Sequence, residues 1–418
     1  MSYQFSVERE LTDYRNFKAI PASGALGAYI EDINLNDLSD DAFVELKEAF
    51  LEFKVLFFRD QPMTEEQHVA FARRWGMPQG PGAVPQVEGY PQIKDQQFDE
   101  LSSIGSDVNY HSDDTFRDYP SKLSILRALA TPPGAGNTIW CDMEKAYDAL
   151  SQPLKDMIDG LDCVHDLDKT FGKVILEGAG AKGWEDMMKR NPPATHPVAP
   201  VHAETGRKCI YPSKLTGKYI TQLSDEESQW LLDFLMQHSY RPEFEVRMGW
   251  EKDTIAMWDN RCLQHRGIND FSPAFRHMQR VAVIDELRPD RHPETQKPLA
   301  FDPTLDYVPV ADLYSPENKP KMTYGAGRTT DEVTDDKVVV KDNGEDDNTP
   351  VDQKFWDKID STREGITFTS GAAASVKKIP GMFRGMALKS IFKEAEAQGK
   401  TQIDVAVLRA VNEQRRAG

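Results

Sequence analysis

The chain has 418 residues, of which 39% are hydrophobic and 28% charged, and its formal net charge is −18. This length suits one large catalytic domain with a smaller addition, and the balance of residues is that of a soluble globular protein. The strong negative charge argues against nucleic acid and anionic membrane surfaces as partners. It leaves room for a small anionic substrate, because a pocket can concentrate arginines locally.

No segment of the sequence suggests export or membrane insertion. No apolar run approaches the length of a membrane span, and residues 1–8 lack the basic start and apolar stretch of a signal peptide. We therefore expect a cytoplasmic protein with no membrane partner. The cysteines lack metal-type spacing and are expected to be free thiols of a reducing compartment. They are Cys141, Cys163, Cys209 and Cys262.

The first part of the chain predicts two helices with a strand between them. Ser39 is a good N-cap for a helix that reaches about residue 53, and the apolar stripe of this helix comprises Phe43, Leu46 and Phe50. Residues 54–59 are mostly apolar and predict a buried strand. Thr64 and Gln67 have the spacing of a capping box and open the second helix.

The middle of the chain contains short β-rich runs separated by long excursions. These runs are residues 123–126, 137–140, 254–258 and 279–285. Ser224 begins another capping box, and its helix is expected to bury Trp230, Leu231, Phe234 and Leu235. The absence of a regular strand–helix alternation favours an antiparallel barrel. We predict a mainly β fold with peripheral helices, a double-stranded β-helix (jelly roll), over residues 1–310.

Beyond residue 310 the composition changes. Aspartate and glutamate crowd residues 328–350, and we expect an acidic linker over residues 311–350. Residues 351–418 predict a small helical C-terminal module. Within it, Pro380 suits a helix start and Gly399 a helix end.

Two segments far apart in the sequence carry the residues with metal chemistry. His111 and Asp113 are two positions apart, so on an extended strand their side chains point to the same face. With the distal His265 they make a two-histidine, one-carboxylate set, which is the ligand set of non-haem Fe(II) oxygenases. A His-x-Asp pair alone is weak evidence. The other histidines are expected to be surface or structural residues, namely His68, His165, His196, His202, His238, His277 and His292.

Three further side chains suit a bound dicarboxylic acid. Arg276 and Arg280 follow His265, on or just before the next expected strand. An arginine there can pair in a bidentate way with the far carboxylate of such a ligand. Thr138 can donate its hydroxyl to the same carboxylate. The alternatives, surface charge for the arginines and an ordinary strand residue for Thr138, remain open at this stage.

The order His-x-Asp, Thr, distal His, Arg, Arg resembles that of the taurine and 2,4-dichlorophenoxyacetate dioxygenases, which depend on Fe(II) and 2-oxoglutarate. The resemblance runs from about residue 18 to residue 290. The segments that are most similar to this family are residues 55–61, 71–76, 196–198, 202–208 and 258–265.

The resemblance implies a site and an activity. His111, Asp113 and His265 would bind iron, and Thr138 and Arg276 would hold the distal carboxylate of 2-oxoglutarate. The implied reaction uses O2 to hydroxylate an unactivated C–H bond of a small organic, anionic substrate, with release of succinate and carbon dioxide. The carboxylate of Asp113 agrees with hydroxylation, because related halogenases lack a carboxylate at this position.

The substrate is less well specified. Arg280 would lie near the substrate or near the inner carboxylate of 2-oxoglutarate. Taurine-specific members of the family carry a histidine at about the place of Gln79, and glutamine cannot contribute a positive charge. Another sulfonate or a carboxylate is therefore favoured, with taurine itself as an alternative. Phe171 and Tyr211 fall near positions that line the family's pocket, and barrel core is their alternative interpretation.

Residues 376–415 resemble a different protein, the small C-terminal module of the B subunit of light-independent protochlorophyllide reductase. This resemblance implies a docking module or a lid. The alternative is a helical hairpin that packs on the barrel or on a second subunit, and we expect a homo-oligomer. Two non-enzymatic functions also stay open. One is an iron or 2-oxoglutarate sensor that acts through this module, and the other is a scaffold with an inert barrel.

Overall fold

The computed structural model describes residues 12–82, 84–98, 109–314, 323–324, 328–329, 347–348, 350–363, 365–378 and 381–417. It divides into two compact units. The first comprises Met1–Asp99, Ser106–Thr170 and Met188–Met322, and the second comprises Glu100–Gly105, Phe171–Met187 and Thr323–Gly418. Among the described helices, none combines the length and the apolar character that crossing a bilayer requires.

The first unit is built on a sheet of eight strands. Every neighbouring pair is antiparallel except β2 and β3. In spatial order the strands are β1 (Lys18–Pro21), β2 (Ala28–Glu31), β3 (Val55–Phe58), β12 (Ile255–Asp259), β6 (Ser121–Ala130), β14 (Arg276–Ile284), β5 (Tyr90–Phe98) and β4 (Gln86–Val87). Strands from both ends of the unit therefore meet in this sheet, since β12 lies between β3 and β6.

A smaller antiparallel sheet supplies the other wall of the core. Its strands, in spatial order, are β11 (Glu245–Met248), β7 (Thr138–Asp142) and β13 (Leu263–Gly267). One buried cluster contains Phe57 and Trp258 of the large sheet together with Trp140 and Val246 of the small one. The predicted jelly roll with peripheral helices is confirmed for this unit.

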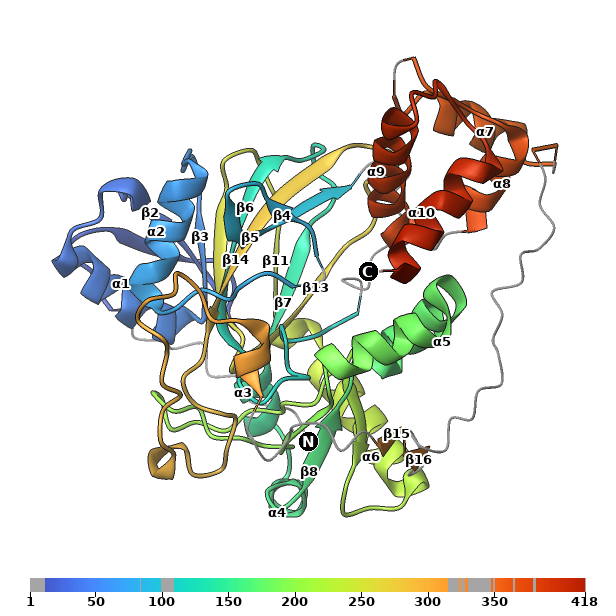
Figure 1. The fold of residues 1–418 in the computed structure, drawn as a ribbon. Coiled ribbons are helices and arrows are strands. Elements are labelled where there is room, and N and C mark those ends of the chain that lie inside the picture. The colour runs from blue at the N-terminus through green and yellow to red at the C-terminus, as the bar shows by residue number, and fades with distance from the viewer. Residues whose placement is uncertain are drawn as a thin grey trace. The chain divides into compact units, whose positions relative to one another are not determined.

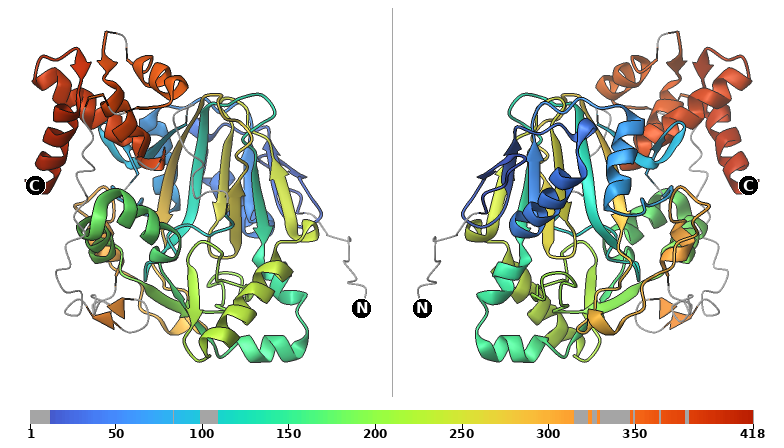
Figure 2. Two further views of the ribbon diagram at one scale, coloured as in Figure 1. Left: turned by 90° about the vertical axis from the view of Figure 1, so that its right-hand side faces the viewer. Right: turned by 90° about the vertical axis from the view of Figure 1, so that its left-hand side faces the viewer.

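Two helices cover the outer face of the large sheet. They are α1 (Asp40–Phe53) and α2 (Glu65–Trp75). In the right-hand view of Figure 2 both lie in front of the strands. Phe50 of α1 and Trp75 of α2 share a second buried cluster with Leu56 and Val281 of the sheet. Because alternate residues of a strand point to opposite faces, β3 and β14 divide their side chains between the two clusters.

The helix starts predicted from local signals are confirmed. Ser39 accepts a hydrogen bond from the backbone N–H of Ala42, and Thr64 and Gln67 form both bonds of a capping box. A second capping box, at Ser224, opens α6 (Asp225–Ser239). One detail was wrong. Trp230 is 60% exposed, whereas Leu231 and Leu235 are buried as predicted, together with Leu232 and Met236, and Phe234 is partly buried.

A third small sheet and further helices complete the first unit. The strands of this sheet, in spatial order, are β10 (Gly217–Ile220), β8 (Asp162–His165) and β9 (Ala194–Pro197). The helices are α3 (Met143–Asp148) and α4 (Gln152–Ile158). The longer α5 (Lys173–Arg190) contains a non-helical residue at Gly180, and most of it belongs to the second unit.

The second unit has its own hydrophobic core. Ile359, Phe368, Ile391 and Val407 are among its fully buried side chains. Its described elements include β15 (Thr323–Tyr324), β16 (Arg328–Thr329), α7 (Gln353–Asp360), β17 (Thr367–Phe368), α8 (Ser370–Lys378), α9 (Gly381–Ala397), β18 (Gln402–Ile403) and α10 (Val405–Ala417), which are labelled in Figure 1 where there is room. Strands β17 and β18 pair in parallel. Most of the predicted acidic linker, and Pro380, lie outside the described residues.

Candidate metal centre

The structure brings His111, Asp113 and His265 together inside the first unit. His111 and His265 form an antiparallel bridge, in which the two backbone N–H groups donate to the opposite carbonyls at 3.0 and 2.8 Å. One candidate ligand atom of each of the three side chains lies within 4.8 Å of the other two. All three residues are buried. The residues singled out in the sequence therefore converge in space.

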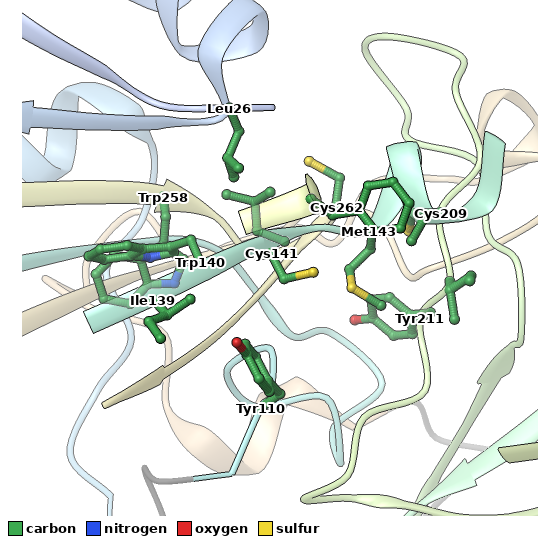
Figure 3. Close-up of a cluster of buried hydrophobic side chains, with 14 of the residues drawn as sticks. Leu26, Tyr110, Ile139, Trp140, Cys141, Met143, Cys209, Tyr211, Trp258 and Cys262 are labelled. Carbon is green, nitrogen blue, oxygen red and sulfur yellow. The ribbon is translucent and has the colours of Figure 1, made fainter. Parts of the chain in front are cut away.

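The small sheet points His265 toward the large one. His265 pairs with Trp140 of β7, so both side chains lie on the same face of that sheet. The ring of Trp258, on the large sheet, lies 4.7 Å from the imidazole of His265 and 5.8 Å from the ring of Trp140. Figure 3 shows the two tryptophans side by side. Packing against these rings orients the imidazole.

Asp113 is held by hydrogen bonds with strands β6 and β14 and with the turn after β12. Ser124 of β6 donates to its Oδ2 at 2.6 Å, and Arg280 of β14 donates to its Oδ1. The side-chain oxygen of Asn260 accepts from the backbone N–H of Asp113 and from the indole N–H of Trp258. Asn260 also donates to Ser124 at 3.1 Å. The carboxylate is thus fixed before any ligand arrives.

The hydrogen bonds leave a nitrogen lone pair on both imidazoles. Nδ1 of His111 donates to the carbonyl of Asn109 at 2.8 Å, so in the neutral ring Nε2 carries the lone pair. Nε2 faces Oδ1 of Asp113 at 3.8 Å. Nδ1 of His265 is buried and has no hydrogen-bond partner among the described residues. Two nitrogen donors and one carboxylate, grouped in this way, fit a ferrous ion that keeps open positions.

The charges around Asp113 favour the ligand forms of these side chains. Burial alone would raise the pKa of Asp113, but the positive charge of Arg280 and the two imidazoles outweigh it and hold that pKa well below its ordinary value. Burial, together with His111, lowers the pKa of His265 well below its ordinary value. At neutral pH the carboxylate is therefore ionised and the His265 ring is neutral.

Thr138 and Arg276 belong to neighbouring parts of the two sheets. Thr138 opens β7 and accepts a hydrogen bond from the indole of Trp250 at 2.9 Å. Arg276 opens β14 and is 8% exposed. It lies over Gly136, where φ is +66°, and a Cβ there would come within 3.2 Å of Nε of Arg276. The close approach needs a glycine and brings Arg276 to the turn just before Thr138.

Of the predicted substrate residues, all described by the structure, only Arg280 contacts the metal centre directly. Arg280 reaches the metal centre through its pair with Asp113. The amide of Gln79 is 2% exposed, and neither its oxygen nor its nitrogen has a partner among the described residues. Tyr211 is buried and packs on His165 and His196, whose rings lie 5.4 and 5.6 Å away. Phe171 lies in the segment that is grouped with the second unit.

Ser124, whose hydroxyl donates directly to Asp113, was not predicted from the sequence. A signal was present, because Ser124 interrupts the apolar run of β6 at a position that faces the core. Asn260, within the family-like segment 258–265, was likewise not singled out as a support of Asp113, although its side-chain oxygen holds the backbone N–H of Asp113. The prediction that the other histidines are structural or at the surface fits His68, His196 and His238, which bond to backbone carbonyls.

Comparisons with known proteins place these observations in a family. Residues 17–282 match the family model described as taurine catabolism dioxygenase TauD, TfdA family. An alkylsulfatase of Acinetobacter baylyi is 34% identical over 279 residues, which is 65% of this chain and 86% of that protein. The alpha-ketoglutarate-dependent 2,4-dichlorophenoxyacetate dioxygenase of Cupriavidus pinatubonensis is 31% identical over 286 residues, which is 64% of this chain and 98% of that protein.

A similar solved structure is that of a taurine dioxygenase from Burkholderia xenovorans. It has a TM-score of 0.58 and 28% sequence identity, and the match covers 72% of this chain and 99% of that one. The matched part of this chain corresponds to whole relatives, whereas residues beyond 282 lie outside the family model.

Proposed function

Because the chain belongs to the TauD, TfdA family of taurine catabolism dioxygenases, we propose that it hydroxylates an unactivated C–H bond of a small organic anion at an iron held by His111, Asp113 and His265. The chain is an alpha-ketoglutarate-dependent dioxygenase, and its cofactors are Fe(II) and 2-oxoglutarate. Succinate and carbon dioxide are the products that accompany hydroxylation.

One observation carries the assignment of the site. Two imidazoles and one carboxylate meet within 4.8 Å. Each imidazole has one nitrogen that makes no hydrogen bond to a described residue, so its lone pair can bind the metal. His111, Asp113 and His265 would hold the ferrous ion, and a set of two histidines and one carboxylate is typical of irons that react with dioxygen. Bound iron supplies the activation of dioxygen that is coupled to decarboxylation of 2-oxoglutarate, while the protein fixes the geometry and limits access of water.

Arg276 and Thr138 are the proposed binding residues for the distal carboxylate of 2-oxoglutarate. The guanidinium of Arg276 is buried, so its pair with a carboxylate is weakly screened by solvent. The rings of Phe98 and Phe271, at 5.9 and 5.6 Å, restrict its position. The hydroxyl of Thr138, which already accepts from Trp250, keeps its proton for the ligand.

The substrate is proposed to be an anion held near Arg280. The relatives named above act on sulfate esters and phenoxyacetates, whose anionic head groups differ but share exposed oxygens. Gln79, Phe171 and Tyr211 are the further proposed substrate contacts, and the buried, unsatisfied amide of Gln79 supports its own assignment.

We also propose the placement of this chemistry in the whole chain. Residues 1–310 would form the catalytic domain, 311–350 a linker and 351–418 a helical module that resembles the protochlorophyllide reductase segment. We propose a cytoplasmic homo-oligomer.

The direct test is oxygen consumption with Fe(II) and 2-oxoglutarate, stimulated by members of a panel of sulfonates, sulfate esters, carboxylates and phosphonates. Succinate should form in step with one of them. Stoichiometric binding of Fe(II) and 2-oxoglutarate with no turnover on any member would favour the sensor, and failure to bind iron anaerobically would favour the inert scaffold.

A variant tests the co-substrate site separately. Arg276→Ala should weaken 2-oxoglutarate binding by roughly 2–5 kcal/mol, because it removes one partner of a buried charge pair. The matched control is Arg73→Ala, since Arg73 is half exposed and pairs with Asp306 at the surface. Equal 2-oxoglutarate affinity in the two variants would contradict the role of Arg276.

A further inference from the structure

Lys94 is a buried cation beside the metal centre that the reaction described above does not use. It lies in β5 and is 7% exposed. The register of β5 and β14 places it directly opposite Arg280. Because opposite residues of an antiparallel pair share a face, both side chains point to the side of the large sheet that carries Asp113's partners.

The ammonium of Lys94 is poorly matched by the protein. Its nearest carboxylate oxygen is Oδ2 of Asp114, at 3.6 Å, which is too long for a hydrogen bond. That oxygen already accepts from the hydroxyl of Ser121 at 2.8 Å. The ammonium donates no hydrogen bond to another described residue. Burial, with Arg280 and Arg117 nearby, lowers the pKa of Lys94 to about 8.

The local charge is positive. Lys94, Arg117 and Arg280 face two carboxylates, Asp113 and Asp114, and the side chains of all five are at most 14% exposed. Iron and 2-oxoglutarate would add opposite charges that cancel. A buried excess of one positive charge is costly unless an anion balances it.

A neutral donor lies on the same face. The bridge between Pro78 and Val283 sets Gln79 opposite Ala282, which is two residues from Arg280 and therefore on its side of β14. The amide of Gln79 is buried with no partner for either polar atom among the described residues. Lys94, Arg280 and Gln79 thus place donors from three segments on one face of the large sheet.

We propose that Lys94 is a second cationic anchor for the substrate, which together with Arg280 binds the oxyanion head group that the reaction leaves unchanged. This inference rests on the proposed function. It assigns to Lys94 the positive charge that a glutamine at position 79 cannot supply. The substrate class is an organic anion with at least two exposed oxygens, so that each cation contacts a different one.

The test compares Lys94→Met, which keeps the length of the side chain, with Lys94→Arg, which keeps its charge. Binding of butanesulfonate, butyl sulfate, pentanoate and neutral pentanamide is measured by calorimetry on anaerobic enzyme loaded with Fe(II) and 2-oxoglutarate. We expect the wild type to bind at least one of the anions more tightly than the amide. Lys94→Met should lower the affinity for that anion at least tenfold. Lys94→Arg should restore the affinity to within about threefold of the wild-type value.

Two further readouts separate this role from a structural one. The affinity for 2-oxoglutarate should change less than twofold, and Lys94→Met should melt at the wild-type temperature or above, because it removes a buried charge. The matched control, Lys208→Met, removes a partly buried lysine that pairs with Asp159 and should leave anion binding unchanged.

The outcomes distinguish this inference from the proposed function. Anion binding by Lys94→Met equal to that of the wild type, binding of none of the three anions, or a parallel loss of 2-oxoglutarate affinity would overturn the role of Lys94. Those results would leave iron-dependent turnover intact. Failure of the wild type to bind Fe(II) and 2-oxoglutarate would instead overturn the proposed function.

Discussion

Among the residues of the first unit that the structure describes, two buried groups have the residue types of a metal site, and only one of them is free to bind a metal. His111, Asp113 and His265 form the first group, and His202, Asp259 and Cys262 form the second. In each, the candidate ligand atoms lie within 4.8 Å of one another and all three residues are buried. Residue type, proximity and burial therefore do not separate them.

The hydrogen bonds do separate them. Asp259 accepts from Nε2 of His202 at 3.0 Å and from two nitrogens of Arg261 at 2.9 and 2.6 Å. Nδ1 of His202 accepts two backbone N–H groups, so that ring has no lone pair to spare. Burial raises the pKa of the Cys262 thiol well above its ordinary value, which keeps it protonated. By contrast, both imidazoles of the first group keep a free nitrogen.

Hydrogen-bond saturation therefore decides whether a buried polar cluster can bind a metal. The second group is a closed ion-pair network at the end of β12, and it serves the fold. The first is preorganised but incomplete, which is the condition for binding an ion.

The largest effect is expected from Asp113→Ala. It removes the only carboxylate of the first group. The affinity for Fe(II) should therefore fall by more than the ~10–100-fold that is typical of losing a residue that only hydrogen-bonds to a metal ligand, and succinate formation should stop. Anaerobic calorimetry and a succinate assay measure the two effects, and circular dichroism checks that the fold is intact. Hydroxylation retained by this variant would remove the basis for distinguishing the two groups.

Asp259→Asn should affect stability instead of metal binding. It leaves Arg261 and His202 buried without their carboxylate, and losing one partner of a buried ion pair destabilises by roughly 3–5 kcal/mol. Denaturant unfolding measures this loss. The stoichiometry of metal binding should stay at one ion per chain. Two ions in the wild type and one in the variant would show that the second group also binds metal.

The parts of the structure that the sequence predicted are those fixed by local bonds or by residue order. Ser39, Thr64 and Ser224 cap their helices within three residues, so no distant contact is needed to predict them. The convergence of His111 with His265 was predicted from the order and type of the ligand residues. It depends on a bridge that the turn between β12 and β13 makes possible.

Lys94 and Ser124 were not predicted because their roles depend on strand register. Lys94 faces the centre only because β5 pairs with β14 so that Lys94 opposes Arg280, and a shift of one residue would turn it away. Ser124 supports Asp113 because β6 lies between β12 and β14. Trp230, in helix α6, was wrongly expected in the core. The 3.6-residue helical period predicts the centre of an apolar stripe, but a residue at the edge of the stripe can still be exposed.

Ser124→Ala tests how the carboxylate of the first group is held in place. Without the hydroxyl, Oδ2 of Asp113 loses its 2.6 Å hydrogen bond and the carboxylate is less well oriented. Fe(II) affinity should fall about 10–100-fold, as is typical for outer partners of a metal ligand. Ser121→Ala is the matched control, because Ser121 lies on the same strand but donates to Asp114. Equal Fe(II) affinities in the two variants would contradict a specific role for Ser124.

The smallest effect is expected from Cys262→Ala, which tests whether the second group is inert. The thiol is 3% exposed and protonated, and it packs in the hydrophobic core near Cys209, as Figure 3 shows. Its removal should cost about 1 kcal/mol of packing and leave Fe(II) binding unchanged. In the wild type, Cys262 should be alkylated only when the protein unfolds. Metal ions should change the alkylation rate only by slowing that unfolding. If Zn(II) protected this thiol in Asp113→Ala, where the first group is disabled, His202 would have to give up its bond to Asp259. Saturation would then not decide which cluster binds a metal.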